Sequence, residues 1–360
     1  SGTTEKDAIP DAASQWAIIG MAIGTLIGGA AQFAVQVPSL FRIGFRFSPA
    51  LSFVDEGVRK VISLMTPAIL GTSAVQINVL VNTYFVSGID GAQGWLSYAF
   101  RLMQFPIGLF GVAVGTASIP VLSRLAAQRK ISEFRDTLSS SINLVFLMTL
   151  PSACGLIVLG EPIIRLIYER GRFDAAATEM TAAALIGYSI GLTGYAAIKI
   201  LSPAFYALDD AKIPMIISVA SIAVNFAASF GLRELLSQWG RTANNPNGFG
   251  HVGVALATSI VALINFFALA FFMRRKISRL NGRVIVAAFA KVAASSAILS
   301  AICYFSYRFQ RFGSGPLTVR LIEVFVPMLL GGLGFVVAAK ILRVAELEQA
   351  ILLVRRKFSK

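Results

Sequence analysis

The stretch WLSYAFRLMQFPIGLFGVAVGTASIPVLSR, residues 95–124, decides the fold class. It contains a long apolar run, and a helix needs about 20 mostly apolar residues to cross the hydrocarbon core of a bilayer. Because every backbone polar group in that core must be paired within the protein, the run is predicted to be a helix rather than a strand. Pro106, Gly108, Gly111 and Gly115 predict a kinked helix that neighbouring helices approach closely.

Similar apolar runs recur along the whole chain. Of its 360 residues, 56% are hydrophobic and only 14% are charged, whereas about a quarter of the residues in soluble globular proteins are charged. This balance predicts an all-α polytopic membrane protein with about nine transmembrane helices. The predicted spans are 15–39, 61–87, 95–119, 137–160, 177–205, 213–233, 251–273, 284–307 and 321–342.

The distribution of basic residues predicts how these helices are oriented. Lys and Arg number 32 against 18 Asp and Glu, and in membrane proteins the cations collect in short cytoplasmic loops. The loops at 42–60, 124–135, 212, 274–283 and 343–360 carry about twice as many cations as the opposite set. These loops are therefore predicted to be cytoplasmic, with the C-terminus inside and the N-terminus outside. Since the chain begins with neither Met nor a signal peptide, we expect it to be the C-terminal part of a longer protein.

Arg101 lies within the quoted stretch, and a charge at the bilayer centre costs about 2.5 to 3.5 kcal/mol. One interpretation is that its side chain snorkels to the nearby outer surface. However, Ser97, Tyr98, Arg101 and Gln104 recur at three- and four-residue spacing, which predicts a polar stripe along one helix face. Such a stripe suits a water-filled cavity, in which the guanidinium would bind an anion such as phosphate. These four residues form the predicted substrate site.

A second polar cluster is predicted where Asn78 and Asn82 interrupt the second apolar span. Asn225 and Ser229, which are four residues apart, and Thr258 are expected to meet them across the bundle. Hydrogen bonding between helices is the simpler interpretation of this cluster, and an ion site is the alternative.

The sequence has none of the residue patterns typical of an enzyme. We find no paired carboxylates within a span, no arguable Ser/His/Asp or Cys/His arrangement, and no phosphate-binding loop followed by Lys and Ser/Thr. The two cysteines do not have metal-ligand spacing, and the single histidine, His251, is expected to form a hydrogen bond. Because the basic residues fall between apolar spans, nucleic acid is not an expected partner. The sequence therefore favours a transporter over an enzyme.

Four blocks of the sequence carry a resemblance to one bacterial family. They read PAILGTSAVQINVLVNTYF (67–85), SYAFRLMQFPIGLFGVAVGTASIPVLSR (97–124), LIYERGRFDAAAT (166–178) and GYSIGLTGYAAIKILSPAFYALDDAKIP (187–214). In their order and spacing the blocks resemble the MurJ (MviN) lipid II flippases over nearly the whole chain. The resemblance implies the fold of the multidrug/oligosaccharidyl-lipid/polysaccharide exporters, which has two six-helix lobes and, in this family, two further helices.

The resemblance also implies a domain organisation. Residues 1–40 would hold an outer loop and the last helix of an incomplete N-terminal lobe, and residues 41–60 a cytoplasmic linker between lobes. Residues 61–273 would form the C-terminal six-helix lobe. Residues 284–342 would form the two extra helices, with a groove for a prenyl tail, and residues 343–360 a cytoplasmic tail.

The function implied by the resemblance is the transport of lipid II, the undecaprenyl diphosphate-linked peptidoglycan precursor, from the inner to the outer leaflet of the bacterial inner membrane by alternating access. Arg101 matches a cavity arginine of the family and would contact the diphosphate. Membrane lipids and cell-wall synthesis proteins are further expected partners. The alternatives are an exporter of another lipid-linked oligosaccharide, a small-molecule efflux pump of the same superfamily, or a scaffold that has lost transport.

The sequence departs from the family pattern in two places. Many relatives have acidic residues where this chain has Phe100 and Gln104, which makes proton coupling through this helix less expected. Some relatives bind a sodium ion in the C-terminal lobe, but amides and hydroxyls replace the carboxylates here. The aligned residues of this possible monovalent-ion cluster are Asn82, Asn225, Ser229, Val254, through its carbonyl, and Thr258. No cofactor is implied, and coupling to the membrane potential, Na+ or H+ is expected.

Overall fold

The structure is a computed structural model that describes residues 12–42, 44, 55–241, 247–309 and 317–348. It divides into two compact units, residues 1–60 and residues 61–360. The first unit contains α1 (Ala12–Arg42), an apolar helix whose last turn carries Arg42. The outer loop, most of the linker and the last part of the tail that the sequence predicts lie outside the described residues.

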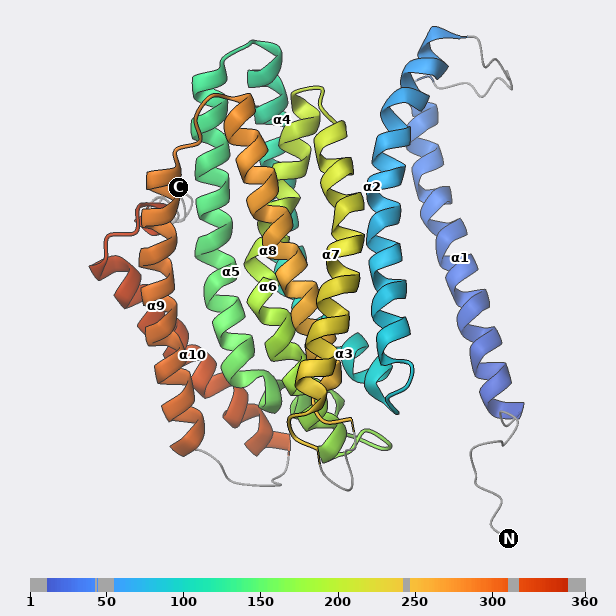
Figure 1. The fold of residues 1–360 in the computed structure, drawn as a ribbon, viewed down its shortest axis with the longest axis vertical. Coiled ribbons are helices and arrows are strands. Elements are labelled where there is room, and N and C mark those ends of the chain that lie inside the picture. The colour runs from blue at the N-terminus through green and yellow to red at the C-terminus, as the bar shows by residue number, and fades with distance from the viewer. Residues whose placement is uncertain (1–11, 43, 45–54, 242–246, 310–316, 349–360) are drawn as a thin grey trace. The chain divides into compact units, whose positions relative to one another are not determined.

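The second unit is a bundle of helices throughout its described part (Figure 1). Its elements are α2 (Glu56–Val86), which begins shortly before the unit boundary, α3 (Ala92–Pro106), the π-helical segment η2 (Ile107–Val112), α4 (Ala113–Ala127), α5 (Ile131–Tyr168), α6 (Ala175–Ala207), α7 (Lys212–Ser237), α8 (Gly250–Lys276), α9 (Gly282–Phe309) and α10 (Leu317–Ile341). With α3, η2 and α4 counted as one span, the described residues contain nine helices long and apolar enough to cross a membrane. The predicted all-α polytopic fold with nine spans is confirmed.

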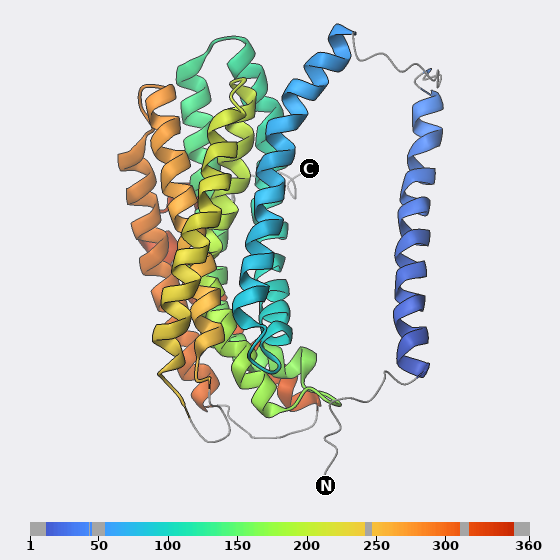
Figure 2. The ribbon, with the colours of Figure 1, turned by 45° about the vertical axis from the view of Figure 1, so that its right-hand side comes forward.

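The turns of the second unit alternate between its two ends (Figure 1 and Figure 2). The α4–α5, α6–α7 and α8–α9 turns share one end, and the α2–α3, α5–α6 and α7–α8 turns share the other. The first end carries cations of the predicted cytoplasmic loops, among them Arg129, Lys212 and Arg275. The cations that the sequence assigns to one side of the membrane therefore gather at one end of this unit.

Small residues bring α6 and α8 together at the centre of the bundle. A Cβ atom added at Gly191 would lie 2.5 Å from the Cα atom of Ser259, far inside van der Waals contact. The Ser259 hydroxyl donates a hydrogen bond of 2.7 Å to the carbonyl oxygen of Gly187. Close approach of this kind is how helices associate in lipid, where burial of apolar surface provides little drive. The glycines of the GYSIGLTG run (187–194) therefore form a packing seam.

The quoted stretch forms a longer and less regular span than the predicted helix 95–119. After Pro106 the chain forms η2 and then resumes as α4. A proline has no N–H, and its ring clashes with the carbonyl one turn earlier, so a wider π-turn accommodates it. Cβ atoms added at Gly111 and Gly115 would lie 3.2 Å from the Cα atom of Ala196 and 2.9 Å from another α6 backbone atom, whereas Gly108 has nothing within 4 Å. The predicted close approach therefore applies at two of these glycines.

The turn between α5 and α6 occupies only a part of the segment 161–178. Residues 161–168 instead continue α5, whose 38 residues extend about 57 Å at 1.5 Å per residue. The turn is confined to residues 169–174, and Asp174 caps α6 by accepting a hydrogen bond of 2.8 Å from the amide of Ala177. Acidic and basic residues four apart stabilise the added helical turns.

Candidate functional site

Arg101 lies on the exposed face of α3. This helix begins after Gly91, whose φ of +81° is unfavourable for residues with a side chain. One face of the helix buries Leu96, Ala99 and Met103 against the bundle. Because these apolar residues recur every three or four positions, the intervening positions face away from the core of the unit.

The exposed face carries three residues of the predicted polar stripe, Ser97, Arg101 and Gln104. Together with Gln93, which the prediction did not include, we call these residues the stripe. The Ser97 hydroxyl donates a hydrogen bond of 2.7 Å to the carbonyl of Gln93. Within the described residues, no hydrogen bond or ion pair reaches the Arg101 guanidinium. The stripe therefore presents a permanent positive charge that no described part of the chain neutralises.

Tyr98 does not point along this stripe. Its ring lies 4.7 Å from that of Tyr168 and 5.3 Å, edge to face, from that of Phe173, measured between centroids. Aromatic pairs at these separations stabilise packing. The half-buried Tyr98 therefore fixes α3 against the end of α5 and the following turn.

A cavity of about 170 Å³ connects the stripe with the second polar cluster. Gln93 and Ser97 of α3 form one wall, and Asn82 and Thr83 of α2 form another. Tyr188 of α6 closes the far side. A ligand or water at the stripe would thus lie next to an amide of the asparagine cluster.

The structure brings together the polar residues that interrupt α2, α7 and α8, and we call Asn82, Asn225, Ser229 and Thr258 the asparagine cluster. The Asn225 amide donates a hydrogen bond of 2.9 Å to Oδ1 of Asn82. The Asn82 amide in turn donates to the Thr258 hydroxyl at 2.9 Å, and that hydroxyl donates to the carbonyl of Val254 at 3.0 Å. This chain of bonds joins three helices, which is the simpler of the two predicted roles.

Two oxygens of the cluster, Oδ1 of Asn225 and Oγ of Ser229, are buried without a hydrogen-bond partner among the described residues. Both are neutral, and no group of three or more His, Cys, Asp or Glu residues in the described chain is placed to hold a metal ion. The cluster therefore offers neutral oxygens and no carboxylate to offset the charge of a buried cation. Its two open oxygens fit a water molecule.

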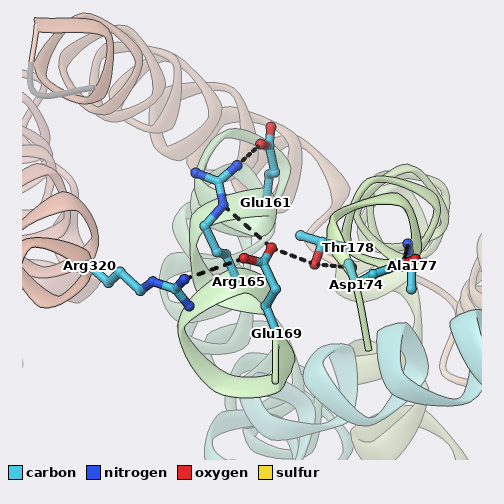
Figure 3. A network of polar contacts seen from close by, with 7 residues as sticks. All are labelled: Glu161, Arg165, Glu169, Asp174, Ala177, Thr178 and Arg320. Carbon is cyan, nitrogen blue, oxygen red and sulfur yellow. Dashed lines mark hydrogen bonds and ion pairs between the residues drawn. The ribbon is translucent and has the colours of Figure 1, made fainter. Parts of the chain in front are cut away.

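A third polar group, which the sequence did not predict as a unit, lies where α5, α6 and α10 meet (Figure 3). Arg165 pairs with Glu161 and, at 3.7 Å, with Glu169. Glu169 also accepts a hydrogen bond of 3.0 Å from the Thr178 hydroxyl and lies 3.5 Å from Nη2 of Arg320. The four-residue spacing within α5 was a usable signal. No sequence pattern marks Arg320 as the partner from α10.

The histidine prediction is also met. His251 is buried, and its Nε2 atom lies 3.0 Å from the carbonyl oxygen of Met180, the hydrogen bond expected from the sequence. Its ring packs against that of Trp95 at 5.1 Å between centroids. His251 thus joins α8 to α6 and α3.

Comparisons with known proteins give a consistent result. The family model "Lipid II flippase MurJ" matches residues 10–323. A probable lipid II flippase MurJ of Vibrio cholerae is 34% identical over 248 residues, which cover 69% of this chain and 45% of that protein. The lipid II flippase MurJ of Burkholderia cenocepacia is 32% identical over 273 residues, which cover 74% of this chain and 49% of that protein. The chain spans about half the length of these curated relatives.

A solved structure shows the same likeness in three dimensions. The structure of a lipid II flippase MurJ in an inward closed conformation matches this chain with a TM-score of 0.67 at 27% sequence identity. The match covers 91% of this chain and 62% of that chain.

Proposed function

Because this chain belongs to the lipid II flippase MurJ family, we propose that it is part of a transporter that moves lipid II from the inner to the outer leaflet of the bacterial cytoplasmic membrane. The family consists of transporters rather than catalysts, and the nine apolar spans make the chain a multi-pass membrane protein. Transport by alternating access requires a site that binds the head group and is open to one side of the membrane at a time.

The observation that carries this proposal is the uncompensated charge of Arg101 on the exposed face of α3. A guanidinium presents parallel N–H donors that match two phosphate oxygens, and it keeps its charge at every physiological pH. Arg101 would bind the diphosphate, and Gln104 and Ser97 would donate hydrogen bonds to neighbouring oxygens of the head group. Tyr98 would position the helix through its aromatic contacts.

The driving force in this proposal is the membrane potential. The cell interior is negative, so it favours outward movement of an anionic diphosphate by about 2.3 kcal/mol per charge and 100 mV. The asparagine cluster has no carboxylate to offset the charge of a sodium ion, and the described part of the stripe has none to carry a proton. Dissipating the potential with valinomycin and K+ should therefore reduce transport, while replacing Na+ with K+ at constant potential should not.

Orientation and partners complete the proposal. The end of the bundle that carries Arg129, Lys212 and Arg275 would face the cytoplasm, where cationic loops accumulate. The C-terminus would then be cytoplasmic, in reach of the proteins that supply lipid II. Proteins of cell-wall synthesis are accordingly the proposed protein partners, and membrane lipids surround the spans.

Lipid II exposure in cells tests the function. Cells depleted of their own lipid II flippase would express the complete transporter that contains this chain, with Arg101, Arg101→Ala or Arg101→Lys, and lipid II in the outer leaflet would be labelled. We expect the wild type to restore exposure, and both variants to fail while reaching the membrane in equal amounts. Arg172→Ala is a matched control, because Arg172 is an exposed arginine in the turn before α6.

Two results would contradict the proposal in different ways. If the wild type restores no lipid II exposure, the substrate is a different lipid-linked oligosaccharide or small molecule. If Arg101→Ala restores exposure as well as the wild type, Arg101 only snorkels to the surface and the head group binds elsewhere.

A further inference from the structure

An apolar groove of about 660 Å³ runs between α5, α8 and α9. Its size lies within the range of about 300 to 1,000 Å³ that is typical of pockets for small ligands. Aromatic rings from three helices contribute to its wall, and several are exposed on the surface of the unit. These rings include Phe146, Phe267, Phe271 and Phe289.

The groove opens at one end into a small polar pocket. Arg274 and Phe271 line both spaces, and Arg275 and Ser278 complete the second pocket, which has a volume of about 250 Å³. This polar pocket lies at the α8–α9 turn, at the end of the bundle that carries the predicted cytoplasmic cations. The two spaces are therefore adjacent, with apolar side chains lining the groove and the arginines lining the pocket at the turn.

The arginines of the polar pocket keep their charge uncompensated within the described residues. Arg274 has no ion pair or hydrogen bond there, and the Arg275 guanidinium lies 4.6 Å above the ring of Phe271. The neighbouring Lys276 is different, because it pairs with Asp210. Burial raises the pKa of the Asp210 carboxyl, but the hydrogen bond and charge of Lys276, together with backbone hydrogen bonds from Ile213 and Lys212, outweigh burial and hold that pKa below its ordinary value. The positive charge of Lys276, beside the pocket, is therefore neutralised. The charges of Arg274 and Arg275, which line the pocket, are not neutralised by any described residue.

We propose that this groove and pocket bind an anionic phospholipid, such as phosphatidylglycerol, with an acyl chain between α5, α8 and α9 and the phosphodiester on Arg274 and Arg275. Guanidinium groups bind phosphate oxygens in pairs, and basic pockets between helices on the cytoplasmic side are where anionic lipids bind. The Ser278 hydroxyl is placed to donate a further hydrogen bond to the head group. The rings of the groove wall would cover the acyl chain.

A bulk phospholipid suits this site better than the transported substrate does. The polar pocket has room for a phosphodiester and a small alcohol, but a disaccharide with a peptide is much larger. The described lining of both spaces includes no residue of the stripe on α3. It also includes no residue of α10, so the site differs from the groove between the last two helices that the sequence resemblance implies for a prenyl tail.

Native mass spectrometry of the purified protein with added lipid tests the polar pocket. We expect phosphatidylglycerol to bind more tightly than phosphatidylcholine, and Arg274→Gln and Arg275→Gln each to raise its Kd about fivefold. Arg279→Gln and Arg283→Gln are the controls, because these cations lie nearby but line neither space, and they should leave the Kd within about twofold. The Arg274→Lys/Arg275→Lys protein keeps the charge but loses the paired hydrogen bonds, so its Kd should lie between that of the wild type and those of the Gln variants.

A second pair of variants tests the groove. Val286→Trp would fill the groove from α9, whereas Val284→Trp changes an exposed position on the same helix that does not line it. We expect only Val286→Trp to reduce phosphatidylglycerol binding. Equal binding of the two lipids, or equal weakening by the control arginine variants, would overturn the proposal. Displacement of phosphatidylglycerol by an equimolar polyprenyl diphosphate would also overturn it, because the site would then belong to the substrate.

Discussion

The asparagine cluster and the α3 stripe are both polar regions in an apolar bundle, but they differ in charge and in pairing. Asn225 is buried, and its amide donates hydrogen bonds to Oδ1 of Asn82 and to the carbonyl of Asn78. Arg101 is exposed and has no partner among the described residues. The cluster is neutral and joins α2, α7 and α8, whereas the stripe is cationic and belongs to one helix.

This difference separates polar groups that stabilise the fold from polar groups that are free to bind a ligand. A buried amide is costly unless it is hydrogen-bonded, so pairing inside the bundle makes the cluster a structural element. An exposed, unpaired guanidinium contributes nothing comparable to folding, and an anion can bind it without breaking an existing bond. The ion-pair network around Glu169 lies between the two, because it is charged, paired and partly exposed.

The largest loss of stability should come from the cluster. Asn225→Leu would leave Oδ1 of Asn82 without its donor, and an unsatisfied buried acceptor costs about 1 to 3 kcal/mol. The free energy of unfolding, measured by SDS titration in mixed micelles, should fall by that amount. Gln76→Leu is the matched control, since it removes an exposed amide from α2.

The double variant Asn82→Leu/Asn225→Leu sharpens the assignment, because removing both partners costs less than leaving one unsatisfied. Its loss should be smaller than the sum of the two single losses. Additive losses would mean that the two amides do not act on each other, and the cluster would not be a structural unit.

Much of this arrangement could be predicted, because the length of an apolar run and the positions of charged residues can be read directly from the sequence. Nine spans and the gathering of cations at one end of the bundle followed from run length and loop composition. Four-residue spacing placed Asn225 and Ser229 on one face, and the structure shows that Asn225 meets Asn82 and thereby Thr258. Spacing was sufficient for this pair because α2 and α7 have few other polar residues within their apolar spans.

The remaining features depend on contacts that no local pattern records. The π-turn after Pro106 is one of several ways to relieve a proline, and packing against α6 decides between them. Arg320 reaches Glu169 across 151 residues of sequence. Likewise, Tyr98 has the spacing of the stripe, but its ring packs against those of Tyr168 and Phe173 instead of lying along the stripe.

A moderate effect on stability is expected when a negative charge is introduced into the asparagine cluster. Asn225→Asp would place a carboxylate beside Asn82 and Ser229, so that a sodium ion becomes a suitable occupant. Exchanging KCl for NaCl should then raise the free energy of unfolding by about 1.4 kcal/mol when Na+ is tenfold above its Kd. The wild type should show no such shift. A sodium-specific stabilisation of the wild type would mean that the neutral cluster already binds the ion.

A smaller loss of stability is expected when the ion-pair network around Glu169 is weakened. Arg320→Gln removes one ion pair of 3.5 Å between partly exposed side chains, and Glu169 keeps its contacts with Arg165 and Thr178. The loss in unfolding free energy should be about 0.5 kcal/mol, because such pairs gain little over hydration. Arg308→Gln, at an exposed position of α9, is the control. A loss as large as that of Asn225→Leu would place this network with the structural elements.

The smallest change in stability is expected at the residue with the largest proposed role in transport. Arg101→Ala removes an exposed side chain that has no partner among the described residues, and such substitutions usually change the free energy of unfolding by no more than about 0.5 kcal/mol. Arg172→Ala, at an exposed position outside the stripe, is the control. A measurement of unfolding in SDS alongside lipid II exposure would show stability retained and transport lost. If Arg101→Ala instead unfolds as readily as Asn225→Leu, the guanidinium has a structural partner, and the distinction between the paired cluster and the unpaired stripe fails.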